Sequence, residues 1–321
     1  MCHNRVVKYN RPAWIAVVLL ALAVPLIVSA DRTAARPAYS RLEPEPGLQG
    51  SLWNALAGLA LNHLVVQKRL AVSLVDVTDI EHPRYAGIND REMMYAASLP
   101  KICALVAGFE KINDGSLAYT ADVKQMFTRM IRYSSNEDAS RAIHAIGFDY
   151  IFKVLTGPKY RFYDPMQNGG LWLGKAYGGA NDYWKRDPLH HLSHGATTWQ
   201  VARFFLLLEQ GRLVSPKYSA EMKEILSKPA LNHKFVKGLE GLNCEIYRKS
   251  GTWSKYHADG ALVEHGGRKY IAAALMEDEH GGEVFPRLIQ RLDAIVVPPQ
   301  TLTSSLTYGA DSASASRSRP Q

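Results

Sequence analysis

Hydrophobic residues near the start of the central part of the chain follow a helical spacing and then a strand-like one. Residues 51–67 predict an amphipathic helix. The apolar side chains that set its spacing are Leu52, Leu56, Leu59 and Leu64. Residues 70–78 are apolar at most positions, and residues 84–88 repeat this after a polar turn, so we expect two strands there.

The next segment, Leu99 to Ile112, is apolar on nearly every side. A helix without a polar face must be buried, and Asn113 to Gly115 favours a left-handed stop at its end. Further helices are expected over 122–133, 137–146 and 198–210. Between the last two, residues 157–195 are rich in Gly, Tyr and Trp without a clear period. Such long irregular segments in compact domains are often functional.

Strand-like patterns return near the end, and a closing helix follows them. The strands are expected over 244–250, 258–264 and 269–276, with a hairpin turn at His265–Arg268 and a helix over 283–296. Two early strands, three late strands and helices between them predict an α+β fold. We expect one mostly antiparallel sheet flanked by the terminal helices, plus an all-helical lobe.

Both ends of the chain differ in composition from residues 51–297, which we expect to form one folded unit with two lobes. In residues 1–30, basic residues precede an apolar run and a small-residue site, which predicts a signal peptide or an uncleaved membrane anchor. Residues 31–50 contain several prolines and charges and predict a linker, and residues 298–321 predict a disordered tail.

The net charge indicates which classes of ligand to expect, and the cysteines indicate whether a disulfide is expected. The net charge is +8, and this mild excess suits anionic ligands or an anionic envelope surface. No run of Lys and Arg with interleaved aromatic residues is present, so nucleic acid is not an expected partner. Cys103 and Cys244 are expected to be buried thiols, since no disulfide between them can be placed from sequence.

Three short motifs occur in order along the chain. They are Ser98-x-x-Lys101, Ser134-x-Asn136 and Lys249-Ser250-Gly251. The first places a hydroxyl and an amine on one face of a helix. At the start of a buried helix, the hydroxyl of Ser98 faces the positive end of the helix dipole. Lys101 can act as a base only when neutral, and both burial and a second cation nearby would lower its pKa.

The second and third motifs can also be explained by ordinary structural roles without catalysis. A Ser or Asn before Glu137 and Asp138 is a normal helix N-cap, and Lys249 is compatible with an exposed strand. The ordered combination of all three motifs favours a single active site instead. This combination resembles that of class A β-lactamases and the related penicillin-binding proteins, and the resemblance covers about residues 52–296.

The resemblance implies a fold and a role for each motif residue. The site would lie in a cleft between the two lobes, in a catalytic domain over 51–297. Ser98 would attack an amide carbonyl, and the backbone N–H groups of Ser98 and Thr252 would form the oxyanion hole. Ser134 would relay a proton to the leaving nitrogen, and Asn136 would hold Lys101 and the substrate amide. The substrate carboxylate would be bound by Lys249, Ser250, Gly251 and Thr252.

Two departures from class A β-lactamases concern the second half of the reaction and the shape of the cleft. Those enzymes carry a Glu on the omega loop that activates the deacylating water. This chain has no Glu between Glu137 and Glu209. Asp182 lies near that place by counting and is the candidate base. Other possible bases are Asp187, His190, His191 and His194. The segment between Ser98 and Ser134 is also shorter, which predicts a more open cleft.

The leading prediction is an exported serine hydrolase of the β-lactamase type, in the periplasm or on the outer face of the cell membrane. One alternative is a penicillin-binding-type D-Ala-D-Ala carboxypeptidase or transpeptidase acting on peptidoglycan, and another is a catalytically silent binding module. The expected partner is a small β-lactam or a peptidoglycan stem peptide, with membrane association through the N-terminal segment. No cofactor is expected. The histidines at 190, 191 and 194 lack a zinc motif, so no metal is expected either.

Overall fold

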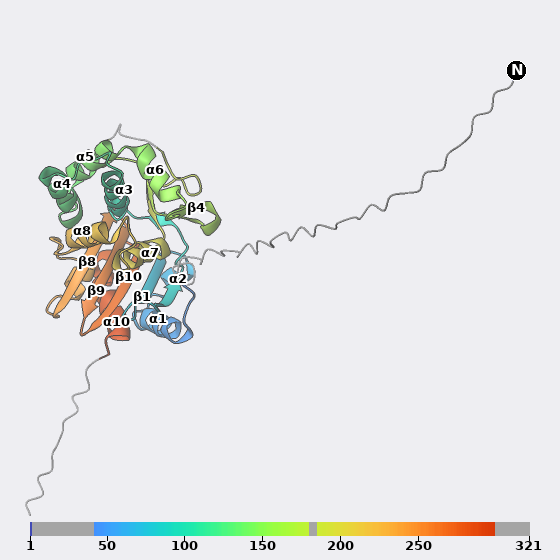
Figure 1. Ribbon diagram of the computed structural model, residues 1–321. Coiled ribbons are helices and arrows are strands. Elements are labelled where there is room, and N and C mark those ends of the chain that lie inside the picture. Colours follow the sequence, from blue (N-terminus) through green and yellow to red (C-terminus); the bar gives the residue numbers. More distant parts are fainter. Residues whose placement is uncertain (2–41, 180–184, 299–321) are drawn as a thin grey trace, which may run out of the picture. The chain divides into compact units, whose positions relative to one another are not determined.

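A five-stranded antiparallel sheet joins the two ends of the folded part of the chain (Figure 1). The computed structural model describes Met1 and residues 42–179 and 185–298. The strands are β1 (Leu70–Asp76), β2 (Arg84–Ile88), β8 (Cys244–Trp253), β9 (Tyr256–His265) and β10 (Arg268–Glu277). Their order is β2-β1-β10-β9-β8, so an early strand pairs with the last one, with Leu74 opposite Ala272.

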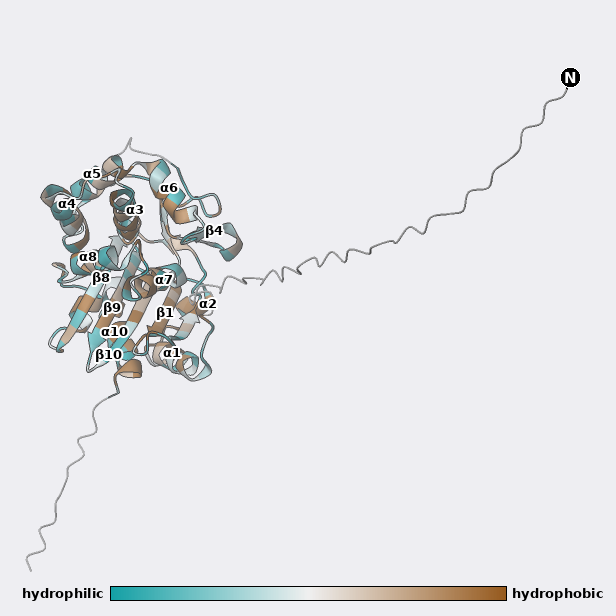
Figure 2. Ribbon diagram, in the orientation of Figure 1, coloured by the Kyte–Doolittle hydropathy of each residue, from teal (hydrophilic) through white to brown (hydrophobic). Residues whose placement is uncertain are grey.

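Helices cover both faces of this sheet, which explains why β1 is apolar at nearly every position. Leu70, Val72 and Leu74 belong to one hydrophobic cluster, while Ala71 and Val75 belong to the other. Successive side chains of a strand point to opposite faces, so the two clusters lie on the two sides of the sheet. Figure 2 shows hydrophobic residues along the strands and along the central helix of the other lobe.

The face that carries Leu70 is covered by helices from the two ends of the domain. These are α1 (Pro46–Gly58), α9 (Phe235–Gly238) and α10 (Gly281–Val296). The short helix α2 (Asn62–Val66) leads from α1 into β1. On the opposite face lies α7 (Thr198–Glu209), whose Val201 and Phe205 side chains pack against β9 so closely that only a glycine fits at Gly260.

The helical lobe is built around α3 (Lys101–Asn113), whose side chains are buried along most of its length. Around it lie α4 (Ala121–Arg132), α5 (Asn136–Ile146), α6 (Phe148–Thr156) and α8 (Pro216–Leu226). Short strands follow: β3 (Met94–Tyr95), β6 (Trp172–Leu173) and β7 (His194–Ala196) form one small sheet. A second pairs β4 (Tyr163–Asp164) with β5 (Gly169–Gly170), and a 3₁₀ turn, η2 (Pro165–Gln167), lies between them.

The predicted α+β architecture is confirmed, and the differences lie at element boundaries and in elements that were not predicted. The helix expected over 51–67 starts at Pro46, because Glu45 caps it through the N–H groups of Gly47 and Leu48. Residues 46–50, expected in the linker, are therefore part of α1. The same segment breaks into α1 and α2 near Ala60, which has a φ of 58°. Helices α6, α8 and α9 were not predicted.

The remaining expectations divide between the described and undescribed parts of the chain. Both cysteines are free thiols, but only Cys103 is buried, whereas Cys244 is half-buried at the start of an edge strand. The predicted N-terminal signal segment and nearly all of the predicted tail lie outside the described residues. No helix among the described residues combines the length and apolarity that crossing a membrane requires.

Candidate active site

Ser98 lies in a tight turn immediately ahead of α3 rather than in its first helical turn. The N–H of Leu99 donates to Ala96 O at 3.0 Å and that of Lys101 to Ser98 O at 3.2 Å, so the turn leads directly into the helix. Ala97 has a φ of 50°, an unfavourable value for a residue with a side chain. Such strain is often found next to reacting groups. Ser98 lines a cleft of about 510 Å³.

Lys101 is fully buried beneath this turn and is held by the second motif. Its ammonium donates to Ser134 O at 2.6 Å and to Asn136 Oδ1 at 2.8 Å, and Ser134 Oγ lies 3.4 Å away. Burial lowers the pKa of Lys101 to about 7. A lysine with that pKa is partly neutral at physiological pH and can accept a proton from a neighbouring hydroxyl.

In the second motif the middle residue caps the helix, and the residues on either side of it do not. The N-cap of α5 is Ser135, whose Oγ accepts the N–H of Asp138 at 3.1 Å. Ser134 stands just before it with a φ of 56°. The side chains of Ser134 and Asn136 are therefore both directed to Lys101, so the N-cap explanation for these two residues is wrong.

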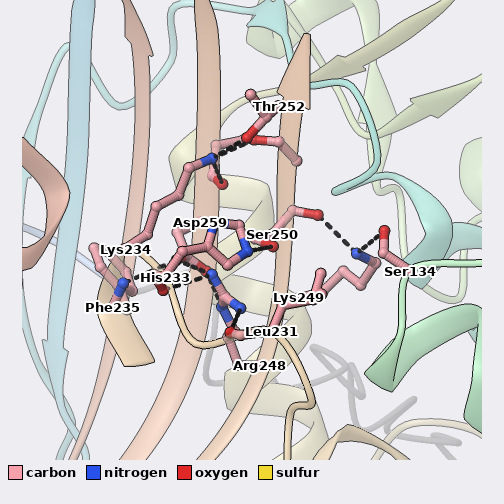
Figure 3. Close-up of polar contacts among 12 residues, drawn as sticks. Ser134, Leu231, His233, Lys234, Phe235, Arg248, Lys249, Ser250, Thr252 and Asp259 are labelled. Carbon is pink, nitrogen blue, oxygen red and sulfur yellow. Dashed lines mark hydrogen bonds and ion pairs between the residues drawn. The ribbon is translucent and has the colours of Figure 1, made fainter. Parts of the chain in front are cut away.

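The third motif lies on strand β8 of the sheet, and its lysine contacts Ser134 of the second motif (Figure 3). Lys249 on β8 is buried, and its ammonium donates to Ser134 Oγ at 2.9 Å and to Ser250 O at 2.7 Å. Burial and the nearby charge of Lys101 hold the pKa of Lys249 well below its usual range. The Ser134 hydroxyl thus receives hydrogen bonds from two lysines and keeps its own proton to donate elsewhere.

The rest of the third motif brings β8 against the Ser98 turn. A Cβ on Gly251 would lie 2.1 Å from Ala96 O and 2.8 Å from Ser98 N, so only glycine allows this approach. Thr252 lines the cleft beside Ser98. Ser250 is buried, and its Oγ lies 3.4 Å from His233 Nε2.

Three charged residues behind β8 were not predicted from sequence (Figure 3). The buried guanidinium of Arg248 forms a two-point ion pair with Asp259 on β9, at 2.8 and 2.7 Å. Lys234 donates to Thr252 Oγ1 at 2.7 Å and to the carbonyl of Gly251. An Asp within an apolar strand pattern signals a buried ionic partner, so Asp259 could have been noticed. Lys234 has no comparable signal.

Aromatic residues also line the cleft, and most of them belong to no motif that the sequence shows. Tyr95, Tyr177 and Trp253 line it together with His194 and Lys175. The ring of Tyr177 lies over the Lys101 ammonium at 4.4 Å. The Trp253 side chain, which is 66% exposed, borders the entrance. The cleft therefore has an aromatic lining, and one of its rings lies over the buried Lys101.

The candidate bases for deacylation differ in whether they line the cleft. Asp182 lies outside the described residues. Asp187 is buried and accepts four hydrogen bonds, from the Tyr163 hydroxyl and from three N–H groups of its own loop, so it organises that loop. His190 and His191 are exposed and do not line the cleft.

His194 is the one histidine among the described candidates that lines the cleft. Its Nε2 lies 2.9 Å from Lys175 O and its Nδ1 lies 3.1 Å from Ser193 Oγ. Burial lowers its pKa to about 4, so the ring is neutral near pH 7 and both nitrogens are engaged. Within residues 42–179 and 185–298, no group of three or more His, Cys, Asp or Glu side chains could hold a metal ion.

Comparison with known proteins agrees with this architecture. Residues 178–297 match the profile of the Beta-lactamase enzyme family. The structure resembles a β-lactamase from Sphaerobacter thermophilus, with a TM-score of 0.57 and 18% identity over 78% of this chain and 96% of that one. It also resembles PBP-A, with a TM-score of 0.58 and 16% identity over 78% and 97%.

A third similar structure is a class A β-lactamase from Bacteroides cellulosilyticus, with a TM-score of 0.57 and 13% identity over 78% and 97% of the two chains. No curated protein matches the chain by sequence. Sequence identities this low are evidence of a shared fold only. The chain therefore has the fold of these β-lactamases and of PBP-A, and residues 178–297 match the Beta-lactamase enzyme family.

Proposed function

We propose that the chain is an acyl-transfer enzyme in which Ser98 is acylated by a β-lactam or a similar amide and water then completes the hydrolysis. The observation that carries this proposal is the hydrogen-bonded chain Lys101–Ser134–Lys249 beside the turn that holds Ser98. It joins residues of the helical lobe to the sheet and supplies both a base and a proton relay.

The proposed reaction uses these groups in turn. Neutral Lys101 accepts the proton of Ser98 Oγ, which attacks the carbonyl carbon. The N–H groups of Ser98 and Thr252 stabilise the oxyanion in the adjoining backbone turn. Ser134 donates its hydroxyl proton to the leaving nitrogen and is reprotonated from the lysines that contact it. Lys249 and the Thr252 hydroxyl bind the substrate carboxylate.

The test is to incubate the purified protein with a penicillin and to follow intact mass and chromogenic turnover together. A transient adduct with turnover supports a β-lactamase. Ser98→Ala should abolish the adduct, whereas Ser116→Ala, an exposed serine just beyond the other end of α3, should leave it unchanged. Labelling that survives Ser98→Ala would contradict the assignment. A turnover rate unaffected by Asp182→Asn would remove Asp182 as the base.

A second candidate is a penicillin-binding-type peptidase or transpeptidase acting on D-Ala-terminated stem peptides. The lining of the cleft favours it, because none of the described residues that line the cleft is a carboxylate that could activate the deacylating water. A mutant of PBP-A, which is similar in fold, is known as an acyl-enzyme complex with penicillin G. A long-lived adduct without turnover would support this candidate. No adduct with any β-lactam or D-Ala-D-Ala peptide would leave the catalytically silent binding module.

Both candidates act on substrates that are met outside the cytoplasm. We therefore include export, to the periplasm or the outer membrane face, in the proposal. It rests on the basic and apolar pattern of residues 1–30. Fusing residues 1–50 to a reporter that functions only after export tests this part separately, and a silent reporter would contradict it.

A further inference from the structure

Tyr177 lines the same cleft as Ser98, and no part of the proposed mechanism uses it. Its ring lies over the Lys101 ammonium at 4.4 Å and packs against the ring of His194, with 4.5 Å between centroids and a tilt of 36°. The aromatic ring therefore contacts both the proposed base of the acylation step and the histidine that lines the same cleft.

Hydrogen bonds at three points fix this ring. The N–H of Tyr177 donates to Ser140 Oγ at 2.9 Å, and that hydroxyl donates back to Tyr177 O at 2.7 Å, so the backbone is attached to α5. At the other end, Tyr177 Oη donates to Ala97 O at 3.1 Å, next to Ser98. Burial raises the pKa of Tyr177 well above its usual range, so the hydroxyl keeps the proton that it donates.

The ring closes the side of Lys101 that its hydrogen bonds leave open. The ammonium already contacts Ser134 and Asn136, and the aromatic face occupies the space where a water molecule would meet it. His194 cannot replace it as the base, because both ring nitrogens are engaged. Hydrolysis of an acyl group on Ser98 needs a water molecule next to such a base.

We propose that Tyr177 is a positioning residue that slows hydrolysis of the acyl-enzyme, because its fixed ring keeps water away from Lys101 and the acylated Ser98. This inference rests on the proposed acylation of Ser98. In the step concerned, water forms a bond to the acyl carbon, the bond from that carbon to Ser98 Oγ breaks, and the proton lost by water returns to Ser98 Oγ through the base. Removing the ring gives water access to Lys101 and shortens the lifetime of the adduct.

The experiment measures formation and decay of the benzylpenicillin adduct by intact mass in the whole protein and three variants. Tyr177→Phe keeps the ring and should keep the lifetime. Tyr177→Ala removes the ring and should shorten the lifetime about tenfold, a part of the 10²–10⁴ that a positioned base supplies. The control is Tyr150→Ala, which removes a ring that lies over Lys111 at 5.7 Å outside the cleft.

A second readout separates this role from a general loss of structure. Water that enters beside Lys101 reduces its desolvation, so in Tyr177→Ala the rise of the acylation rate with pH should move to higher pH. Tyr177→Leu repeats the test with a side chain that fills more of the space if the alanine variant unfolds. Equal adduct lifetimes with and without the ring would overturn the inference. Absence of any adduct on the unmodified protein would instead overturn the proposed function.

Discussion

The charge of one buried lysine controls the proposed chemistry at the scale of single residues. Burial lowers the pKa of Lys101 to about 7, and only the neutral amine can take the proton of Ser98. The acylation rate should therefore rise about tenfold between roughly pH 6 and 8 and then level off. Rapid-quench mass measurements of adduct formation across this range test it. A rate that does not change with pH would exclude Lys101 as the base.

Gly251 gives a second prediction at this scale. In Gly251→Ala the new methyl group collides with Ala96 O and Ser98 N, so β8 or the Ser98 turn must move. We expect a loss of about 1–3 kcal/mol in the free energy of unfolding, as for other overpacked sites. Adduct formation should slow by more than about tenfold, because misplacing catalytic groups by an ångström is costly.

The matched control is Gly50→Ala, in the middle of α1, where an added Cβ has no neighbour within 4 Å. Alanine should stabilise this helix by about 0.5–1 kcal/mol and leave adduct formation unchanged. Urea denaturation and adduct kinetics on both variants give the comparison. Equal acylation by Gly251→Ala and the unmodified protein would show that the close approach of β8 is not needed.

The sequence was informative for residues whose neighbours in the chain reveal their role. Ser98 and Lys101 form one short motif, and Ser134 and Asn136 form another, so local spacing was enough to single them out. The contacts that join the two motifs, from Lys101 to Ser134 and Asn136, span 33 and 35 residues and were implied only by the family resemblance. Tyr177 and Lys234 contact residues far away in sequence, such as Ala97 and Thr252. Such contacts depend on tertiary packing, which no local pattern encodes.

At the scale of elements, β8 and β9 are held together by the buried ion pair between Arg248 and Asp259. Asp259→Asn would leave the guanidinium buried without its countercharge. Breaking such a pair from one side costs about 3–5 kcal/mol in the free energy of unfolding. The solvent-accessible pair of Lys255 and Glu277 joins the ends of the neighbouring strands, and Glu277→Gln should destabilise the protein far less, because water already screens that pair.

Urea denaturation of both variants measures the difference. Because Arg248 precedes Lys249, we also expect Asp259→Asn to slow acylation, whereas Glu277→Gln should not. Equal unfolding midpoints for the two variants would mean that the buried pair does not support β8. Acylation that is unchanged in Asp259→Asn would mean that the support does not reach Lys249.

Helices and strands with a long hydrophobic pattern were predicted well. Their ends were predicted less well where a single local contact decides them. The hairpin turn before β10 was expected from two glycines, and both have positive φ values there. By contrast, α1 starts at Pro46 because Glu45 caps it, and the helix ends near Ala60 although the apolar spacing continues. The strands β4 to β7 are two or three residues long, and β7 pairs with β3 and β6 from other parts of the chain, so residues 157–195 showed no periodicity.

At the scale of the whole molecule, one sheet serves as the shared wall of both hydrophobic clusters. Along β10, Ile271 and Ala273 belong to the cluster of the helical lobe, whereas Tyr270 and Ala272 belong to the cluster under α1 and α10. The motifs of the candidate site come from both lobes, since Lys101 lies on α3 and Lys249 on β8. Loss of either cluster should therefore disrupt the sheet and with it the cleft.

Leu52→Ala tests this coupling from a position away from the cleft. Leu52 is fully buried on α1, in the cluster on the far side of the sheet from the helical lobe. Removing its side chain should lower the free energy of unfolding by about 2–5 kcal/mol. Below the melting transition, adduct formation should keep its normal rate, because the new cavity lies across the sheet from the cleft.

On heating, loss of adduct formation and loss of helical circular dichroism should coincide in Leu52→Ala, as expected for one cooperative unit. The control is Trp53→Ala, the neighbouring residue whose side chain is 45% exposed, which should shift the transition much less. If acylation disappears well below the transition seen by circular dichroism, the helical lobe and the sheet unfold separately. In that case the shared sheet does not couple the terminal helices to the cleft.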